Sequence, residues 1–260
     1  MQRTVLVVGD AQQAEFADAV AILRQQCECT FSSSSDIADV IAGGPPQWIV
    51  LLQSRIGQFT APQLATLRRR YPLATVLAIT GFWTAGQLRT GKPLPGVTTI
   101  PWSVAGRRLA ALLASLRELP PPTASAEEAI AWDLEELEAL SGLVVIGADR
   151  QSDFQYWADA VRSFGMSAVW RTPQSRVRAA QIAAVIYLPV NWNRSQAADA
   201  ATFLADHPAE SRILGIGLPR LEDQRLADEI GFTAILGRPF GLRDLQLAIS
   251  APAAAGNTAS

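Results

Sequence analysis

The stretch that decides the fold is Val5-Leu6-Val7-Val8-Gly9, an unbroken apolar run that ends in a glycine. Behind it Phe16, Val20 and Leu23 repeat at helical spacing, and a second strand-like segment follows. A continuous apolar strand that leads into an amphipathic helix is typical of a parallel sheet with helices on both faces. The stretch therefore predicts the first strand of an α/β domain.

The same stretch returns in the second half of the chain as Leu143-Val144-Val145-Ile146-Gly147. Four further segments recur in the same order. They are Gln13–Phe16 and Gln151–Phe154, Trp48–Leu52 and Ala184–Leu188, Val76–Ile79 and Ile213–Ile216, and Pro101–Trp102 and Pro239–Phe240. The members of each pair lie about 137 residues apart, which is the size of a whole domain. The chain is therefore predicted to be a tandem duplication.

Each copy holds five predicted strands that alternate with predicted helices. The strands are expected near Thr4–Val8, Glu28–Ser32, Trp48–Leu52, Thr75–Ile79 and Val97–Ile100, and near Leu143–Ile146, Ser167–Trp170, Ala184–Leu188, Ile213–Ile216 and Ala234–Leu236. Right-handed crossovers make a doubly wound sandwich the simplest topology for such an order. The expected fold class is α/β, with two tandem flavodoxin-like, doubly wound, five-stranded parallel-sheet domains joined by a helical linker.

The expected domains span residues 1–119 and 142–252, with a linker at 120–141 and a disordered tail at 253–260 that has little to bury. Three prolines from Pro120 end the first domain, and the acidic segment after them opens with the form of a capping box. Ile130, Leu134, Leu137 and Leu140 give this segment an apolar stripe at helical spacing. We expect its helix to pack on one of its own domains, and a coil that joins two chains is the less favoured alternative because the stripe is short.

Composition excludes several classes of function. The formal net charge of -2 and the pI near 5.5 argue against a nucleic-acid-binding protein. Cys27 and Cys29 are expected in one strand as buried small residues, and His207 is the single histidine, so no zinc site of the usual kind and no histidine-dependent catalytic pair is expected. No apolar run is as long as a membrane span and the pattern of a signal peptide is missing, so the expected location is the cytoplasm.

The end of the second copy carries a specific motif. Leu236-Gly237-Arg238-Pro239-Phe240 resembles the Lys-Pro-Phe close of response-regulator receiver domains, which share the five-strand order expected here. The resemblance covers both copies and implies a phosphorylation site at the carboxyl ends of the strands. It implies an acidic pair after the first strand that holds magnesium, an aspartate at the end of the third strand that accepts the phosphoryl group, a hydroxyl residue after the fourth, and a lysine on the fifth.

The first copy departs from this pattern at most of these positions. Asp10 is the one carboxylate left of the acidic pair, and Gln53 stands at the acceptor position. Thr80 keeps the hydroxyl group, whereas Ile100 occupies the position of the lysine. The amide of Gln53 offers no nucleophilic oxygen, so this copy is not expected to form an aspartyl phosphate.

The second copy departs from the pattern further. Asp149 lies one residue too late for the acidic pair, Pro189 stands at the acceptor position, and Gly217 replaces the hydroxyl residue. Arg238 replaces the lysine. Both copies are therefore expected to be pseudo-receivers, and we expect no catalytic residues, no metal, no cofactor and no enzymatic activity.

The segment Gly81–Gly96 occupies the place of the fourth receiver helix, but its glycines and prolines forbid more than about one or two helical turns. Tryptophan together with arginine or lysine is typical of binding hot spots. The candidates for partner contacts are Trp83, Arg89, Lys92, Arg55, Trp102, Trp192 and Arg194. Two alternatives stay open: Phe82 and Trp83 fill the space left by the missing helix, or Arg55, Arg89 and Lys92 bind an anion.

The leading functional hypothesis is a regulatory or scaffold protein that acts in signal transduction through protein–protein interaction without being phosphorylated. The alternative is a sensor of a small molecule or nucleotide, and less an enzyme, that uses a pocket at the carboxyl ends of the strands. The protein partner is left unnamed by the sequence, a homodimer is an open alternative, and neither nucleic acid nor membrane is expected as a partner.

Overall fold

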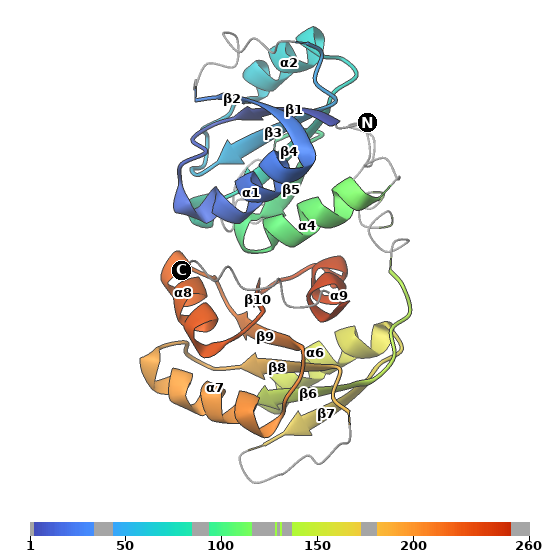
Figure 1. Ribbon diagram of the computed structural model, residues 1–260, viewed down its shortest axis with the longest axis vertical. Coiled ribbons are helices and arrows are strands. Elements are labelled where there is room, and N and C mark those ends of the chain that lie inside the picture. The colour runs from blue at the N-terminus through green and yellow to red at the C-terminus, as the bar shows by residue number, and fades with distance from the viewer. Residues whose placement is uncertain are drawn as a thin grey trace. The chain divides into compact units, whose positions relative to one another are not determined.

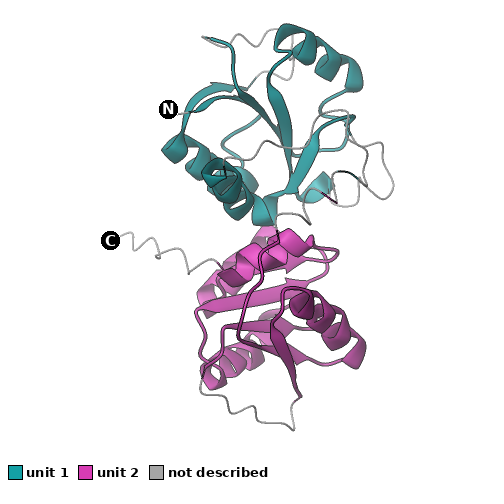
Figure 2. Ribbon diagram, turned by 90° about the vertical axis from the view of Figure 1, so that its right-hand side faces the viewer, with its two compact units in different colours: residues 1–130 teal, residues 131–260 magenta. Residues whose placement is uncertain are grey.

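The structure is a computed structural model of the 260-residue chain, and it describes residues 3–33, 44–84, 94–115, 128, 131, 137–172 and 181–250. The chain divides into two compact units, residues 1–130 (unit 1) and 131–260 (unit 2), shown in Figure 2. The division falls inside the predicted linker 120–141. Residues 116–127 and the predicted tail lie outside the described residues.

Unit 1 holds a five-stranded, all-parallel sheet with the strand order β2-β1-β3-β4-β5. Its strands are β1 (Arg3–Val8), β2 (Cys27–Ser32), β3 (Trp48–Gln53), β4 (Thr75–Thr80) and β5 (Thr98–Pro101). Its described helices are α1 (Ala17–Gln26), α2 (Ala61–Arg70) and α4 (Trp102–Ala114), with short 3-10 helices at Ala14–Phe16 and Phe82–Thr84. Figure 1 shows α1 and α4 on one side of the sheet and α2 on the other.

Unit 2 repeats this topology, with the strand order β7-β6-β8-β9-β10 in a second all-parallel sheet. Its strands are β6 (Leu143–Ala148), β7 (Ser167–Arg171), β8 (Ala184–Leu188), β9 (Ser211–Ile216) and β10 (Ala234–Gly237). Its described helices are α6 (Gln151–Ser163), α7 (Arg194–Asp206), α8 (Leu221–Ile230) and α9 (Leu242–Ser250). In each unit the first strand lies between the second and the third, which is the flavodoxin-like order, so the predicted fold class is confirmed.

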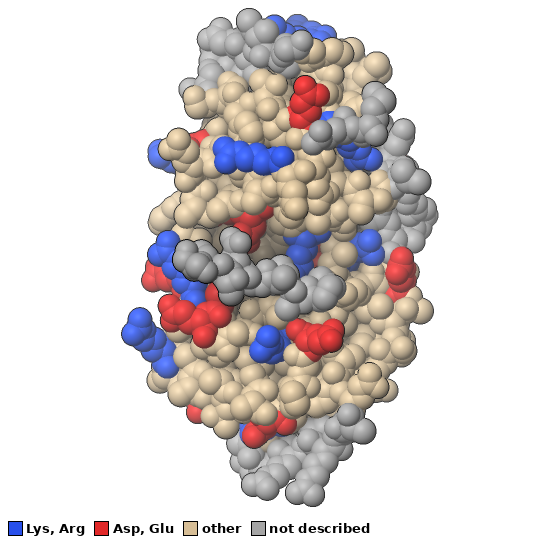
Figure 3. Space-filling model, viewed as in Figure 1, with Lys and Arg blue, Asp and Glu red and all other residues tan. Residues whose placement is uncertain are grey.

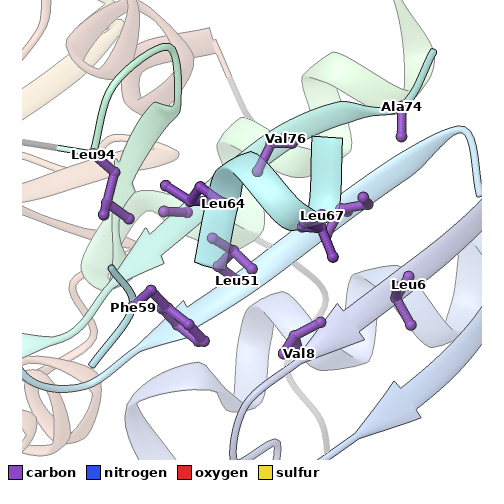
Figure 4. Packing of buried hydrophobic residues seen from close by; sticks show 11 residues of the cluster. Leu6, Val8, Leu51, Phe59, Leu64, Leu67, Ala74, Val76 and Leu94 are labelled. Carbon is purple, nitrogen blue, oxygen red and sulfur yellow. The ribbon is translucent and has the colours of Figure 1, made fainter. Parts of the chain in front are cut away.

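The core of unit 1 forms because α2 lays Leu64 and Leu67 on the sheet, as Figure 4 shows. Alternate residues of each strand point to the same face, so β1, β3 and β4 meet these leucines with every second side chain. The cluster consists of Leu6, Val8, Ile49, Leu51, Phe59, Leu64, Leu67, Ala74, Val76, Ala78 and Leu94. Burying one such side chain stabilises the fold by roughly 1.5–3 kcal/mol, so the cluster is a major source of the stability of unit 1.

The core of unit 2 covers both faces of its sheet. On one face Phe203 of α7 and Ala227 of α8 pack in one cluster with Leu214 of β9. Gly215, the next residue of the strand, points to the other face, where the ring of Trp157 on α6 fills the space that a Cβ would need. The sheet is therefore doubly wound, as the continuous apolar strands predicted.

Local sequence signals fix several helix ends. Thr60 and Gln63 form a capping box at the start of α2, with the backbone N–H of Thr60 donating to Gln63 Oε1 over 2.9 Å. Asn193 caps α7, and its Oδ1 accepts from the N–H groups of Ser195 and Gln196. Gly231 ends α8 at φ 98°, a conformation that a side chain would make unfavourable.

One prediction for the linker is wrong. The stripe Leu137–Leu140 was expected to continue its helix, but residues 137–140 are not helical. Their backbone instead bonds to other segments of unit 2: the N–H of Leu140 donates to the carbonyl of Phe164 over 2.7 Å, and the side-chain amide of Gln246 donates to the carbonyl of Glu138 over 2.6 Å. These bonds use backbone groups that a helix would need. Glu128 and Ala131 are helical, and the remaining residues of 116–136 lie outside the described part of the chain.

The predicted strands match the observed ones to within two residues at each end. Cys27 and Cys29 both lie on β2, where Cys27 is buried and Cys29 half-buried. Among the helices that the structure describes, none combines the length and the apolar character needed to cross a bilayer.

Candidate interaction surface at the strand ends

All five strands of each sheet are parallel, so the turns that follow them meet at one edge. In unit 1 the register pairs Val8 with Leu51, Gln53 with Thr80, and Thr80 with Pro101. The turns after β1, β3 and β4 therefore lie next to one another. The described residues of this edge include most of the receiver-like positions of unit 1. They also include its candidate contact residues Arg55 and Trp83.

The acceptor position of unit 1 is closed. The Gln53 side chain is 1% exposed, and its Nε2 donates to the carbonyl of Arg55 over 3.3 Å. Beside it Thr80 Oγ1 donates to the carbonyl of Ile100 over 3.4 Å, and Ile100 itself is buried. Asp10 is exposed at the end of β1 and accepts at Oδ1 from the N–H of Gln12 over 3.0 Å. The amide and hydroxyl groups at this position thus bond within the chain.

The turn after β3 is closed by the amide of Gln58. Its Oε1 accepts from the N–H of Ser54 over 2.8 Å, from Ser54 Oγ over 3.1 Å and from the N–H of Arg55 over 3.3 Å. Its Nε2 donates to the carbonyl of Leu52 over 3.0 Å. This network fixes the turn, on which Arg55 is exposed and the Ile56 side chain is 57% exposed.

The turn after β4 is closed in a different way. The N–H of Gly81 donates to the carbonyl of Gln53 over 2.8 Å, and the N–H of Phe82 donates to Glu15 Oε2 over 2.9 Å. A Cβ on Gly81 would overlap the carboxylate of Glu15, so this glycine makes room for it. Thr84 Oγ1 donates back to the carbonyl of Gly81 over 2.7 Å. The turn after β1 thus holds the turn after β4.

Trp83 lies on this closed turn with 73% of its side chain exposed, and its ring meets Phe82 edge to face at 5.2 Å. The alternative that Trp83 fills a hole in the core is therefore wrong. Phe82 is half-buried, and Leu94, on the far side of the segment, is buried in the core. Neighbouring residues of the 3-10 turn Phe82–Thr84 point in different directions, so the Phe82 ring is half-buried and the Trp83 ring is exposed.

One further candidate of unit 1, Trp102, is not part of this surface. Trp102 is buried at the start of α4, so it is a core residue of unit 1 and not an exposed contact residue. The pattern Pro101-Trp102 begins a helix whose first residue faces inward. Arg89 and Lys92 lie outside the described residues, so the predicted anion site keeps Arg55 as its one described member.

The strand ends of unit 2 are closed as well. Arg238, at the lysine position, forms an ion pair with Asp153, with Arg238 Nη1 2.9 Å from Asp153 Oδ1. Both side chains are largely shielded from water. Pro189 is buried at the acceptor position, whereas Gly217 and Asp149 are exposed. Arg238, which takes the place of the receiver lysine, is thus bound to a carboxylate of the same unit.

Exposed apolar side chains follow the third and fourth strands of unit 2, as they do in unit 1. Val190, directly after Pro189, is 45% exposed, and Leu218, directly before the buried Pro219, is 58% exposed. A proline fixes its own backbone angle φ, so both turns are stiff. Sequence analysis missed Ile56, Val190 and Leu218, although each is an apolar residue in a polar or glycine- and proline-containing turn.

The remaining candidates of unit 2 lie beside these turns. Trp192 is half-buried and packs edge to face on Phe232 at 6.0 Å. Its indole Nε1 is buried without a hydrogen-bond partner among the described residues. Arg194 is the first residue of α7 and is exposed. Trp192 is therefore mainly a packing residue, whereas Arg194 is available for contacts.

The cysteines and the histidine offer no reactive centre. Burial raises the pKa of Cys29 to about 11 and also raises the pKa of Cys27. Because the thiolate is the nucleophile, both thiols are poorly reactive at neutral pH. His207 is buried with Nδ1 2.9 Å from the carbonyl of Phe203. The described parts of the chain hold no group of three or more His, Cys, Asp or Glu side chains placed to bind a metal ion.

No family model and no curated protein matches this chain. The solved structures that are similar to it at low identity include the following three. The first is named as a two-component system response regulator/GGDEF domain protein, with 11% identity, a TM-score of 0.31, and coverage of 94% of this chain and 95% of that one. The second is a Salmonella typhimurium LT2 protein named as sugar-binding, with 14% identity, a TM-score of 0.25, and coverage of 95% and 84%.

The third is the N-terminal part of a Bacteroides fragilis protein that contains a phosphatase domain, with 9% identity, a TM-score of 0.31, and coverage of 97% of this chain and 94% of that one. TM-scores this low carry no argument about function. The side chains at the strand ends are therefore the basis of the function proposed below.

Proposed function

We propose that this chain is a regulatory or scaffold protein whose two receiver-like units bind other proteins without being phosphorylated. The observation that carries the proposal is the repeated exposure of large apolar side chains at the strand ends. Ile56 and Trp83 follow the third and fourth strands of unit 1, and Val190 and Leu218 follow those of unit 2. Exposed apolar side chains that gather at the same place in both copies mark a surface for protein contacts.

The closed turns support this reading because they lower the entropy lost on binding. Gln58 fixes the turn of Ile56, and Glu15 fixes the turn of Trp83. Side chains on a turn that is already ordered bind with less loss of conformational freedom than those on a flexible loop. A large, rigid aromatic side chain such as Trp83 is also the residue type most enriched in binding hot spots.

The same strand ends give little support to a small-molecule site. The side chain of Gln53 donates to the carbonyl of Arg55, Ser54 Oγ donates to Gln58 Oε1, and Arg238 bonds to Asp153. A ligand would have to replace these internal bonds with its own. Protein contact through the exposed apolar side chains requires no such exchange.

The test is quantitative capture of proteins from native lysate by the full-length chain. The bait is compared with the double variant Trp83→Ala/Leu218→Ala and with Leu73→Ala. Leu73 is 96% exposed in the turn between α2 and β4, at the opposite end of the strands, so it is the matched control. We expect the double variant to lose at least tenfold of the specifically captured proteins and the control to lose none. Equal capture by all three baits would contradict the proposal.

A further inference from the structure

The described strand-end turns of unit 1 carry exposed charges of both signs. The described turns after β1, β3 and β4 (residues 9–16, 54–60 and 81–84) contain three charged side chains, which are Asp10, Glu15 and Arg55. Glu15 accepts from the N–H of Phe82 and is half-buried, so it is used within the unit. One exposed anion and one exposed cation remain, on the turns of the adjacent strands β1 and β3.

Asp10 and Arg55 are both available for a contact outside the unit. Asp10 is oriented by the N–H of Gln12, which donates to Oδ1. Among the described residues neither the carboxylate of Asp10 nor the guanidinium of Arg55 forms an ion pair. Ile56 follows Arg55 in the same turn, and Trp83 lies in the turn after β4, the strand next to β3. These are the two most exposed large apolar side chains among the described residues of this edge.

A two-fold axis makes such a surface match itself. In a symmetric dimer the same patch meets from both chains, so residue i contacts j and j contacts i. An axis that passes between the turns after β1 and β3 brings Arg55 of each chain to Asp10 of the other and forms two equivalent ion pairs. The apolar side chains of Ile56 and Trp83 then lie next to these pairs, as apolar residues do in interfaces with a polar rim.

The overall charge does not oppose self-association. The formal net charge is -2 over 260 residues, so repulsion between two chains is weak. On the face shown in Figure 3, positive and negative side chains are interspersed and separated by wide uncharged areas, so no field of one sign dominates that face.

We infer that the strand-end surface of unit 1 binds a second copy of this chain through Trp83, Ile56 and reciprocal Arg55–Asp10 pairs. This inference rests on the proposed function, because it names the protein that one of the two surfaces binds. The strand-end surface of unit 2 is then the one that remains for other partners.

The experiment measures the self-association of the full-length chain by sedimentation velocity over a range of concentrations. The wild-type chain forms a dimer, and Trp83→Ala raises its dissociation constant by roughly 30-fold or more, as the loss of a hot-spot residue does. Leu73→Ala and Leu218→Ala leave the constant unchanged. All three side chains concerned are exposed, and circular dichroism and the melting temperature check that each variant is folded.

Charge reversal tests the contact itself. Asp10→Arg and Arg55→Asp are each expected to weaken the homodimer by about tenfold, because each sets like charges opposite one another. An equimolar mixture of the two variants restores association to within about threefold of the wild type, since each chain then offers the charge that the other one lacks. Restoration by mixing cannot come from a contact within one chain.

Two results would overturn the inference. One is a chain that sediments as a monomer at every concentration, and the other is a dimer that is equally stable in all variants. The capture experiment of the proposed function is independent of both results. A monomeric chain that still captures proteins through Trp83 and Leu218 leaves the function standing and removes the dimer.

Discussion

At the scale of single residues, the acceptor positions are the basis for the proposal that the two units are not phosphorylated. Gln53 is buried and donates to the carbonyl of Arg55, and Pro189 is buried without any group that could attack phosphorus. Arg238 is engaged by Asp153. Phosphoryl transfer depends on a positioned nucleophile and on metal and cation charges around it. Neither acceptor position offers a carboxylate, and the lysine positions hold the buried Ile100 and the paired Arg238.

We therefore expect the chain to be inert toward phosphate donors. Incubation with magnesium and acetyl phosphate leaves its mass unchanged in intact-protein mass spectrometry, and beryllofluoride causes no change in hydrogen exchange. A phosphorylatable receiver treated in parallel is the positive control. A stoichiometric adduct that is stable in acid and labile in base would refute the interpretation of both units as pseudo-receivers.

Two tryptophans of unit 1 provide the second residue-scale prediction. Trp83→Ala changes the free energy of unfolding by less than about 0.5 kcal/mol, because an exposed side chain contributes little to the fold. Trp102→Ala lowers it by roughly 3–5 kcal/mol, since it leaves a cavity under α4. Urea unfolding followed by circular dichroism measures both values. A large loss of stability for Trp83→Ala would show that the ring packs in the core.

At the scale of elements, the turns are held by contacts between segments that lie far apart in the sequence. Glu15 follows β1 and binds the backbone of Phe82 after β4. Gln58 bonds within its own turn and back to the end of β3. The turns are thus tied to the sheet and to one another, and the apolar side chains on them are presented in a fixed direction.

The contact between Glu15 and Gly81 predicts a coupled pair of substitutions. Gly81→Ala displaces the Glu15 carboxylate, and Glu15→Ala removes it, so both changes release the N–H of Phe82. Each is expected to cost about 1–2 kcal/mol locally, and the double variant no more than one of them, because all three lose the same hydrogen bond.

Hydrogen exchange at the Phe82 amide, measured by NMR on the full chain, reads out this effect. Both single variants accelerate exchange by roughly 5- to 30-fold, the kinetic equivalent of that loss. Glu15→Gln, whose amide oxygen can still accept the hydrogen bond, is the conservative control and retains most of the protection. Strictly additive effects in the double variant would contradict the contact.

The sequence predicted the strands and their order well, because buried parallel strands consist of apolar residues throughout and crossovers have one hand. It failed where a residue's environment depends on the fold. Trp102 is buried because it opens a helix on its inward side, and residues 137–140 are not helical because unit 2 binds their backbone. The hydrogen bonds of Glu15 and Gln58 involve tertiary contacts that no local pattern contains. The sequence repeat includes Glu15 and Asp153, but it does not show that Glu15 binds the backbone of Phe82 or that Asp153 pairs with Arg238.

At the scale of the whole molecule, the chain is a duplicated domain in which each copy has its own complete sheet and core. The cluster that contains Leu64 and Leu67 lies within unit 1, and the cluster that contains Phe203 and Ala227 lies within unit 2. Domains with separate cores can fold independently. The tandem arrangement places two strand-end surfaces on one polypeptide, which suits a protein that brings partners together.

Independent folding leads to the last prediction. Limited proteolysis is expected to cut in the proline-containing segment Pro120–Ser125 and to release fragments of about 120–140 residues, within the usual size of a domain. Separately expressed residues 1–119 and 137–252 each give a cooperative thermal transition and the circular dichroism spectrum of an α/β protein. If both pieces were unfolded, the division into two units would be wrong.

The ion pair Asp153–Arg238 has a consequence for the history of the duplication. Asp153 occupies the same place in the second copy as Glu15 does in the first, but it holds a guanidinium group after the fifth strand, whereas Glu15 holds a backbone amide after the fourth. The carboxylate at this place thus has a different partner in each half. The two halves are therefore not interchangeable. In a chimera in which only the turns after the first strands are exchanged, each carboxylate meets the partner that belongs to the other one. At the Asp153–Arg238 pair the loss of one charge leaves the other without its partner, so these two residues are expected to change together, whereas Glu15 binds a backbone amide that does not depend on the side chain at position 82.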